Sequence, residues 1–394
     1  MKNQLEKIWT RSFISIFMTQ FLVFVVFYTL ITTLPLYVIQ EMDGTEAQGG
    51  LVVTSILIAA IAVRPFSAGL LDRIGKKKGL VLSVSVFTLT TFIYIGIESF
   101  VPLMILRFIH GLSFGVITTA TGAIAADLIP PARRGAGLGY FAMSMNLAVV
   151  AGPFIGLSLL QFVSFKTLFI ILSIFMIVGI LSTLLVHVKE PVGAETTVKK
   201  GKLSIHSLVE LKALPIAIIA SLISLAYASI LSFISVYAES IGLAAAASFF
   251  FLVFAGVMLL SRPSLGRAFD SRGARFVILP CLLIFVAGLV MLSITSSAWM
   301  LFVAAALIGL GYGTLLPSFQ TMAIQTAEPA RSGHATATFF MLYDAGIALG
   351  SFIWGLVVSG YGYQSLYLVC AVLVLVVMVL FNMYYKKQQK PHAS

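Results

Sequence analysis

Charged residues are scarce in this chain. Only 10% of its 394 residues are Asp, Glu, Lys or Arg, whereas 60% are hydrophobic. A soluble protein carries about 25% charged residues. Because so few charges cannot cover a surface that faces water, most of the surface must face lipid, and we predict a membrane protein.

Cysteine is rare as well. The two cysteines, Cys281 and Cys370, lie inside apolar runs, where cysteine behaves as a small buried hydrophobe. The sequence has no metal-ligand spacing, no nucleophile paired with a base, and no phosphate-binding GxxxxGK[ST] motif. We therefore expect no metal, no cofactor, no direct use of ATP and no enzymatic activity.

Apolar runs of about 20 residues recur along the chain, each long enough to cross ~30 Å of hydrocarbon as a helix. Strands of a membrane barrel would instead show alternating apolar and polar residues over about 10 residues. The first run is too long for the core of a signal peptide. The predicted fold class is an all-α membrane protein with twelve transmembrane helices. We place them at residues 12–39, 49–71, 79–97, 102–126, 135–161, 166–188, 212–238, 247–269, 276–296, 300–324, 333–360 and 364–385.

The net charge is +11, and the positions of the basic residues match the topology of these spans. With the N-terminus in the cytoplasm, every Lys and Arg lies in a cytoplasmic segment except Lys166, Arg64, Arg107 and Arg262. This is the positive-inside bias of membrane proteins. We predict a multi-pass protein of the cell (inner) membrane with both termini in the cytoplasm. Its expected partners are the lipid bilayer, a small organic substrate and protons, with no nucleic acid, and we expect a monomer.

The chain repeats itself at an offset of 198 residues. The stretch RPFSAGLLDRIGKKKG, from Arg64, has the counterpart RPSLGRAFDSRGAR, from Arg262. The same offset relates Gly111 to Gly309, Gly115 to Gly313, Gly152 to Gly350, and residues 131–135 to 329–333. We infer two six-helix halves related by a pseudo-twofold axis along the membrane normal, an arrangement that suits alternating access to a central site.

The predicted halves are residues 1–188 and 212–394. Residues 189–211, between them, form the only long polar stretch of the chain. We interpret this stretch as a cytoplasmic linker, with room for a short amphipathic helix.

Three motifs resemble those of the major facilitator superfamily, and the resemblance covers the whole chain. RPFSAGLLDRIGKKKG resembles the loop between its second and third spans, and RFIHGLSFG, from Arg107, resembles its span-4 motif. AVVAGPFIG, from Ala148, resembles the span-5 motif of its drug–proton antiporters. Ala68 and Ala148 stand where the family usually has glycine. The resemblance implies a secondary transporter.

The loop between the second and third spans is a predicted gate. Gly75 permits a tight turn, and Asp72 is placed to face the N-terminus of the span that begins near Ser332 in the other half. The resemblance implies that this contact latches the outward-open state. The expected gating residues are Asp72, Arg73, Gly75, Asp127 and Asp270, with Arg73 or Lys76 pairing with Asp127. Lys77 and Lys78 are interpreted as topology signals only.

Three residues inside spans are candidates for proton coupling: Asp344, Arg107 and His110. Asp344 is the only acid that we place deep in a span, where desolvation favours a carboxyl that can hold a proton. It also suits a static ion pair with Arg107 or Arg262. The resemblance gives Arg107 a part in proton coupling or in bonding the first span, and a structural bond to Gln20 is the alternative. His110 can titrate or be a buried neutral histidine.

The span-5 motif contains Ala148, Gly152, Pro153 and Gly156. Pro153 should kink the helix and free a backbone carbonyl. The small residues should form a packing face, which we expect against the span at 247–269. The resemblance implies that this motif tightens the outer seal of antiporters.

The resemblance places spans 1, 4, 7 and 10 around the cavity. The candidate cavity residues on them are Gln20, Phe24, Tyr28, Thr118, Tyr227, Phe233 and Tyr312. An aromatic cavity with few charges favours amphipathic or lipophilic organic substrates. We predict proton-coupled efflux of such compounds. The alternatives are an exporter of a polar metabolite such as a metallophore or a sugar, an uptake symporter, and a membrane enzyme or sensor without transport.

Overall fold

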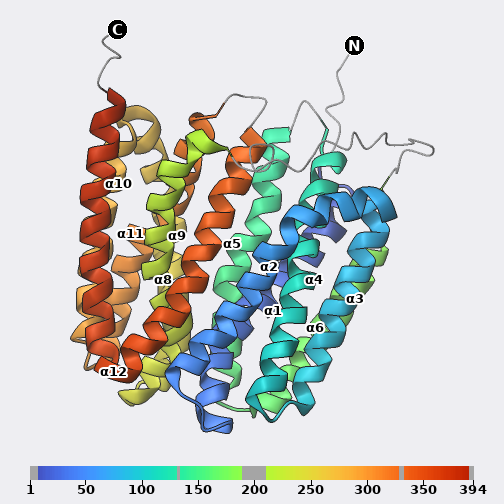
Figure 1. Ribbon diagram of the computed structural model, residues 1–394, viewed down its shortest axis with the longest axis horizontal. Coiled ribbons are helices and arrows are strands. Elements are labelled where there is room, and N and C mark those ends of the chain that lie inside the picture. Colours follow the sequence, from blue (N-terminus) through green and yellow to red (C-terminus); the bar gives the residue numbers. More distant parts are fainter. Residues whose placement is uncertain (1–7, 131–133, 189–209, 328–331, 390–394) are drawn as a thin grey trace. The chain divides into compact units, whose positions relative to one another are not determined.

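A computed structural model describes residues 8–130, 134–188, 210–327 and 332–389 (Figure 1). Within these ranges all regular secondary structure is helical. The N-terminal half contains α1 (Arg11–Glu41), α2 (Glu46–Ile74), α3 (Lys76–Ile93), η1 (Tyr94–Gly96), α4 (Phe100–Leu128), α5 (Arg134–Leu159) and α6 (Phe165–Leu184).

The C-terminal half contains η3 (Leu211–Ala213), α8 (Leu214–Ser240), α9 (Ala244–Arg272), α10 (Ala274–Ser293), α11 (Ala298–Gln325) and α12 (Ser332–Gln389). The last of these is two helices joined at Gly362, where φ is 78° and helical geometry is interrupted. In the described part of the chain, counting α12 as two spans, the all-α fold with twelve spans in two six-helix halves is confirmed. The predicted linker, apart from Glu210 and Leu211, lies outside the described residues.

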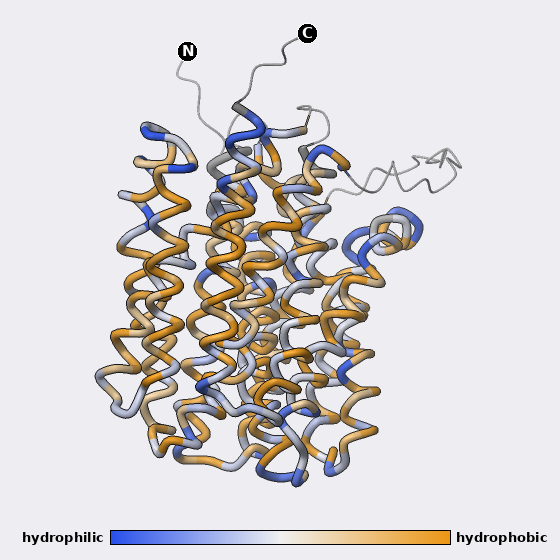
Figure 2. Tube along the Cα trace, turned by 60° about the vertical axis from the view of Figure 1, so that its left-hand side comes forward, coloured by the Kyte–Doolittle hydropathy of each residue, from blue (hydrophilic) through white to orange (hydrophobic). Residues whose placement is uncertain are grey.

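The surface of the helices is apolar along most of their length. Figure 2 shows hydrophobic residues along the middle of the helices and hydrophilic residues mainly near their ends. Large side chains such as Leu260 and Phe66 are 84% and 66% exposed. Such an apolar surface is suited to contact with lipid. In lipid, helices satisfy their own backbone hydrogen bonds.

The chain forms two compact units, and the division into halves at residues 189–211 stays a prediction. One unit comprises residues 1–37 and 55–200, and the other comprises residues 38–54 and 201–394. Residues 38–54 belong to the second unit because they contact α12. Thr54 Oγ1 donates to the Ala348 carbonyl at 2.6 Å, and the helix backbones approach closely at Gly50 and Gly355.

The internal repeat is visible as the same contacts inside each unit. A Cβ at Gly111 would lie 2.3 Å from the Ile56 carbonyl oxygen, and a Cβ at Gly309 would lie 2.2 Å from that of Phe254. These partners are again 198 residues apart. The tight turns also match, because Gly75 and its counterpart Gly273 have φ values of 90° and 85°.

Candidate functional site

A buried polar cluster lies near one end of α4 in the first unit. The side chains of Arg107 and His110 are 0% exposed. The Tyr94 hydroxyl and His110 Nδ1 are 3.0 Å apart and share a hydrogen bond. Arg107 is close enough to act electrostatically on both partners. The structure therefore brings together the two predicted residues, Arg107 and His110, and adds Tyr94.

The other ring nitrogen of His110 is the open position of this cluster. Its Nε2 is buried and has no hydrogen-bond partner among the described residues. The Phe87 ring packs on the imidazole with a centroid distance of 3.9 Å. The Arg107 guanidinium is the charged group close to this ring.

Gln20 is a cross-link between helices. Its Nε2 donates to Ser144 Oγ at 3.1 Å, and its Oε1 accepts from Thr121 Oγ1 at 2.7 Å. The amide thereby joins α1, α4 and α5 of one unit. These two bonds engage both ends of the Gln20 amide, and its role in the cavity stays a prediction.

Aromatic rings from α1 and α4 form a second cluster in the first unit. The rings of Phe27 and Phe114 stack at 4.1 Å, and Phe24 meets Phe114 edge to face at 5.3 Å. Tyr28 stacks on Phe24 at 6.0 Å. Thr118, one turn beyond Phe114 on α4, is half-buried and donates to the Gly115 carbonyl of its own helix at 3.1 Å.

Tyrosines form the corresponding cluster in the second unit. The rings of Tyr227 and Tyr312 stack at 3.8 Å with an interplanar angle of 13°. The Tyr312 hydroxyl is hydrogen-bonded to that of Tyr343. Two predicted cavity residues are thus in direct contact, and Tyr343 was not predicted. Phe233, predicted with them, is fully buried elsewhere, with its ring end next to Gly50.

Asp344 lies on α12 directly after Tyr343. It is half-buried and close enough to act electrostatically on Tyr343. The backbone here is fixed to α8, because Ser224 Oγ donates to the Tyr343 carbonyl at 2.7 Å. Asp344 therefore lies beside the tyrosine cluster. Its role in proton coupling stays a prediction.

The small residues of α5 pack against α1. A Cβ at Gly152 would meet the Tyr28 side chain, the Val25 carbonyl and the Thr29 amide within 2.9 Å. Thr29 Oγ1 also donates to the Gly152 carbonyl at 2.8 Å. We expected this face to pack against the span at 247–269. That expectation was wrong, because the small residues pack closely against a helix of their own unit. Ala148 is fully buried, Pro153 lies inside the helix, and Gly156 faces Thr29 and Thr33 of α1.

The gating loop contains an ion pair between Lys76 and Asp127. Lys76 Nζ lies 2.5 Å from Asp127 Oδ2, so Lys76, and not Arg73, forms the predicted pair. Asp72 is exposed at the end of α2. Its latch to the other half stays a prediction. The loops at 131–133 and 328–331 lie outside the described residues, as does the side chain of Asp270.

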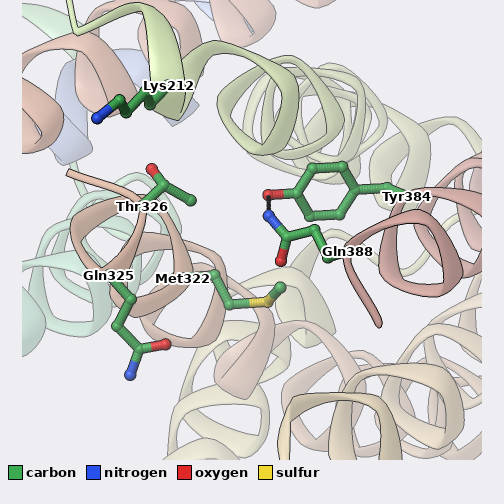
Figure 3. Close-up of a pocket in the computed structure, with 6 residues that line it drawn as sticks. All are labelled: Lys212, Met322, Gln325, Thr326, Tyr384 and Gln388. Atoms are coloured by element: carbon green, nitrogen blue, oxygen red, sulfur yellow. Dashed lines mark hydrogen bonds between the residues drawn. The ribbon is translucent and has the colours of Figure 1, made fainter. Parts of the chain in front are cut away.

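A pocket of about 410 Å³ lies at the helix ends of the second unit. Figure 3 shows Met322 between Thr326 and the Tyr384–Gln388 pair, whose side chains meet in a hydrogen bond of 2.6 Å. Its lining residues are Lys212, Met322, Gln325, Thr326, Tyr384 and Gln388. None of them was predicted as a site residue, and no lining residue is an acid or belongs to the tyrosine cluster.

A family model described as Major Facilitator Superfamily matches residues 16–277 and 252–394. The chain belongs to the major facilitator superfamily. It is therefore a membrane-embedded transporter that acts on small substrates, and it is not an enzyme. This membership agrees with the three motifs that resemble those of the family.

Relatives in the superfamily carry the name multidrug resistance protein MdtG. The proteins of that name from Enterobacter lignolyticus and Escherichia fergusonii are each 26% identical to this chain. The matches cover 96% of this chain in both cases, and 91% and 94% of the respective relatives.

Solved structures also match the fold of this chain. The crystal structure of the nucleoside transporter NupG has a TM-score of 0.74 at 16% identity, with 94% of this chain and 99% of that chain covered. A POT family transporter in complex with a thioalcohol-conjugated peptide has a TM-score of 0.76 at 14% identity, with 96% and 97% covered. At these identities the likeness establishes the fold.

Proposed function

We propose that this transporter exports amphipathic or lipophilic organic compounds from the cytoplasm in exchange for protons, by alternating access. In this proposal both termini are cytoplasmic. The carrying observation is a pair of aromatic clusters, one in each unit, with Asp344 next to the second. The multidrug names of the relatives and the span-5 motif support the direction of transport.

The aromatic clusters support the proposed substrate class. Phe24, Phe27 and Phe114 form an apolar cluster of rings, and Tyr227 and Tyr312 add hydroxyls at the ring ends. Aromatic pockets with few polar groups bind apolar bodies of varied shape, since burial of apolar area is not directional. A sugar site would need many amides and carboxylates. These features favour drugs and lipophilic metabolites over sugars and metallophores.

The acid on α12 supports the proposed coupling. A carboxyl group can carry a proton when neutral and attract a cationic substrate when ionised. Asp344 lies beside the hydrogen-bonded Tyr312 and Tyr343. His110 is a weaker carrier while Arg107 remains beside it, because two adjacent buried cations repel. We therefore assign Asp344 the larger share of proton transfer, and we assign the Arg107 cluster to positioning.

The proposed function is tested in inside-out membrane vesicles that contain the full chain. We expect an acidic vesicle interior to drive accumulation of an amphipathic fluorescent dye, and a protonophore to abolish it. Vesicles without the protein are the control. Dye accumulation that needs the protein and survives collapse of the proton gradient would overturn proton coupling. Equal accumulation with and without the protein, across a panel of amphipathic dyes, would overturn the substrate class.

A further inference from the structure

The polar cluster of the first unit, which contains Tyr94, Arg107 and His110, has an apolar counterpart in the second unit. The internal repeat places three apolar residues at the corresponding positions, 198 residues further along the chain: Leu292, Ala305 and Ile308. Both sets are buried to the same degree, since no member is more than 1% exposed. The two units therefore fill equivalent interior positions with different chemistry.

The surroundings of the two sets are alike. Phe87 and its counterpart Phe285 are both 0% exposed, and each lies near the ring one turn beyond the set, with centroids 6.4 Å apart for Phe87 and Phe114 and 5.6 Å apart for Phe285 and Tyr312. The same helix packing thus forms around a polar set and around an apolar one. Because a charge inside a membrane is costly, the polar set indicates a role in transport.

Tyr94 connects the members of the polar cluster. Its ring packs against Phe169 of α6 with a centroid distance of 5.6 Å. Its hydroxyl shares the 3.0 Å hydrogen bond with His110 Nδ1, and the Arg107 side chain interacts with the same hydroxyl. The Phe87 ring covers the imidazole at 3.9 Å. The Tyr94 hydroxyl therefore joins the guanidinium to the imidazole one turn further along α4.

We propose that Tyr94 and His110 are positioning residues for Arg107. Their hydrogen bond fixes the Tyr94 hydroxyl, and the hydroxyl in turn holds the Arg107 side chain in one orientation. A long arginine side chain loses much rotamer freedom when it is fixed, and the tyrosine–histidine pair supplies that order before a substrate binds. The effect on transport rests on the proposed function, whereas the arrangement of the three side chains does not.

The first test is Tyr94→Phe, which removes one oxygen and keeps the ring. In the inside-out vesicles, we expect the maximum rate of proton-driven dye accumulation to fall about tenfold, the usual effect of losing a hydrogen bond to a charged group. The half-saturating dye concentration should not change, because the aromatic clusters are intact. The matched control is Tyr237→Phe, which removes a buried hydroxyl that donates to the Leu292 carbonyl and should keep the wild-type rate.

The second test varies His110. The amide of His110→Asn offers an acceptor or a donor near the position of Nδ1, and this variant should keep more of the rate than His110→Ile, which carries the residue of the second unit. Tyr94→Phe should add no further loss to Arg107→Lys, because both changes disturb the same arrangement.

A third measurement needs no transport. In the purified full chain with isotope-labelled histidine and arginine, Tyr94→Phe should shift the side-chain NMR signals of His110 and Arg107, and Tyr237→Phe should not. These shifts in a protein whose wild type moves no dye would overturn the proposed function alone. Unshifted signals, a wild-type rate in Tyr94→Phe, equal losses in the two His110 variants, or additive losses with Arg107→Lys would each overturn the positioning role. Unchanged melting temperatures establish that the variants are folded.

Discussion

The substitution Asp344→Asn is expected to reduce proton-coupled export to the background of empty liposomes while the protein stays folded. Asparagine matches aspartate in size and cannot exchange a proton at neutral pH. The internal repeat supports the tolerance of the fold, since the residue that corresponds to Asp344 in the first half is Asn146. Substrate exchange without net proton movement should survive, because the aromatic clusters are unchanged.

The measurement for Asp344 is substrate-driven proton flux in liposomes that contain a pH-sensitive dye. Asp344→Glu keeps the carboxyl and should retain part of the flux. Glu239→Gln removes an acid from the end of α8 in the same unit, outside the tyrosine cluster, and should leave the flux near that of the wild type. Coupled flux in Asp344→Asn that equals the wild type would remove this residue from the mechanism.

The substitution Gly309→Ala is expected to destabilise the second unit. Its new Cβ would lie 2.2 Å from the Phe254 carbonyl oxygen, a backbone atom that cannot turn away as a side chain can. The contact between α11 and α9 must therefore open. Overpacking of this kind costs about 1–3 kcal/mol, which lowers the melting temperature by roughly 3–10 °C.

Unfolding of the second unit can be followed through its two buried cysteines. Cys281 and Cys370 are both buried there, so a thiol-reactive dye measures their exposure on heating. Gly256→Ala is the matched control, because this glycine lies on α9 with no atom within 4 Å of a Cβ. Alanine should be neutral or slightly stabilising there. Equal melting temperatures for the two variants would show that the α9–α11 contact tolerates a methyl group.

The number of spans and the internal repeat could be predicted from the sequence. Both depend on local or one-dimensional properties. A run of about 20 apolar residues must be helical in lipid, because only a helix satisfies its backbone hydrogen bonds within one segment. A duplicated chain keeps its glycines at a constant offset, and Gly111 and Gly309 do meet equivalent carbonyls.

The partners of individual side chains were decided only by the tertiary structure. The contacts of Tyr94 with His110 and of Tyr343 with Tyr312 depend on how far each helix is rotated about its axis, and an almost uniformly apolar helix carries little sign of that rotation in its sequence. The same reason explains why the small face of α5 meets α1, and why residues 38–54 pack with α12. The sequence by itself determined which segments cross the membrane, and close packing between segments distant in the chain determined which residues meet.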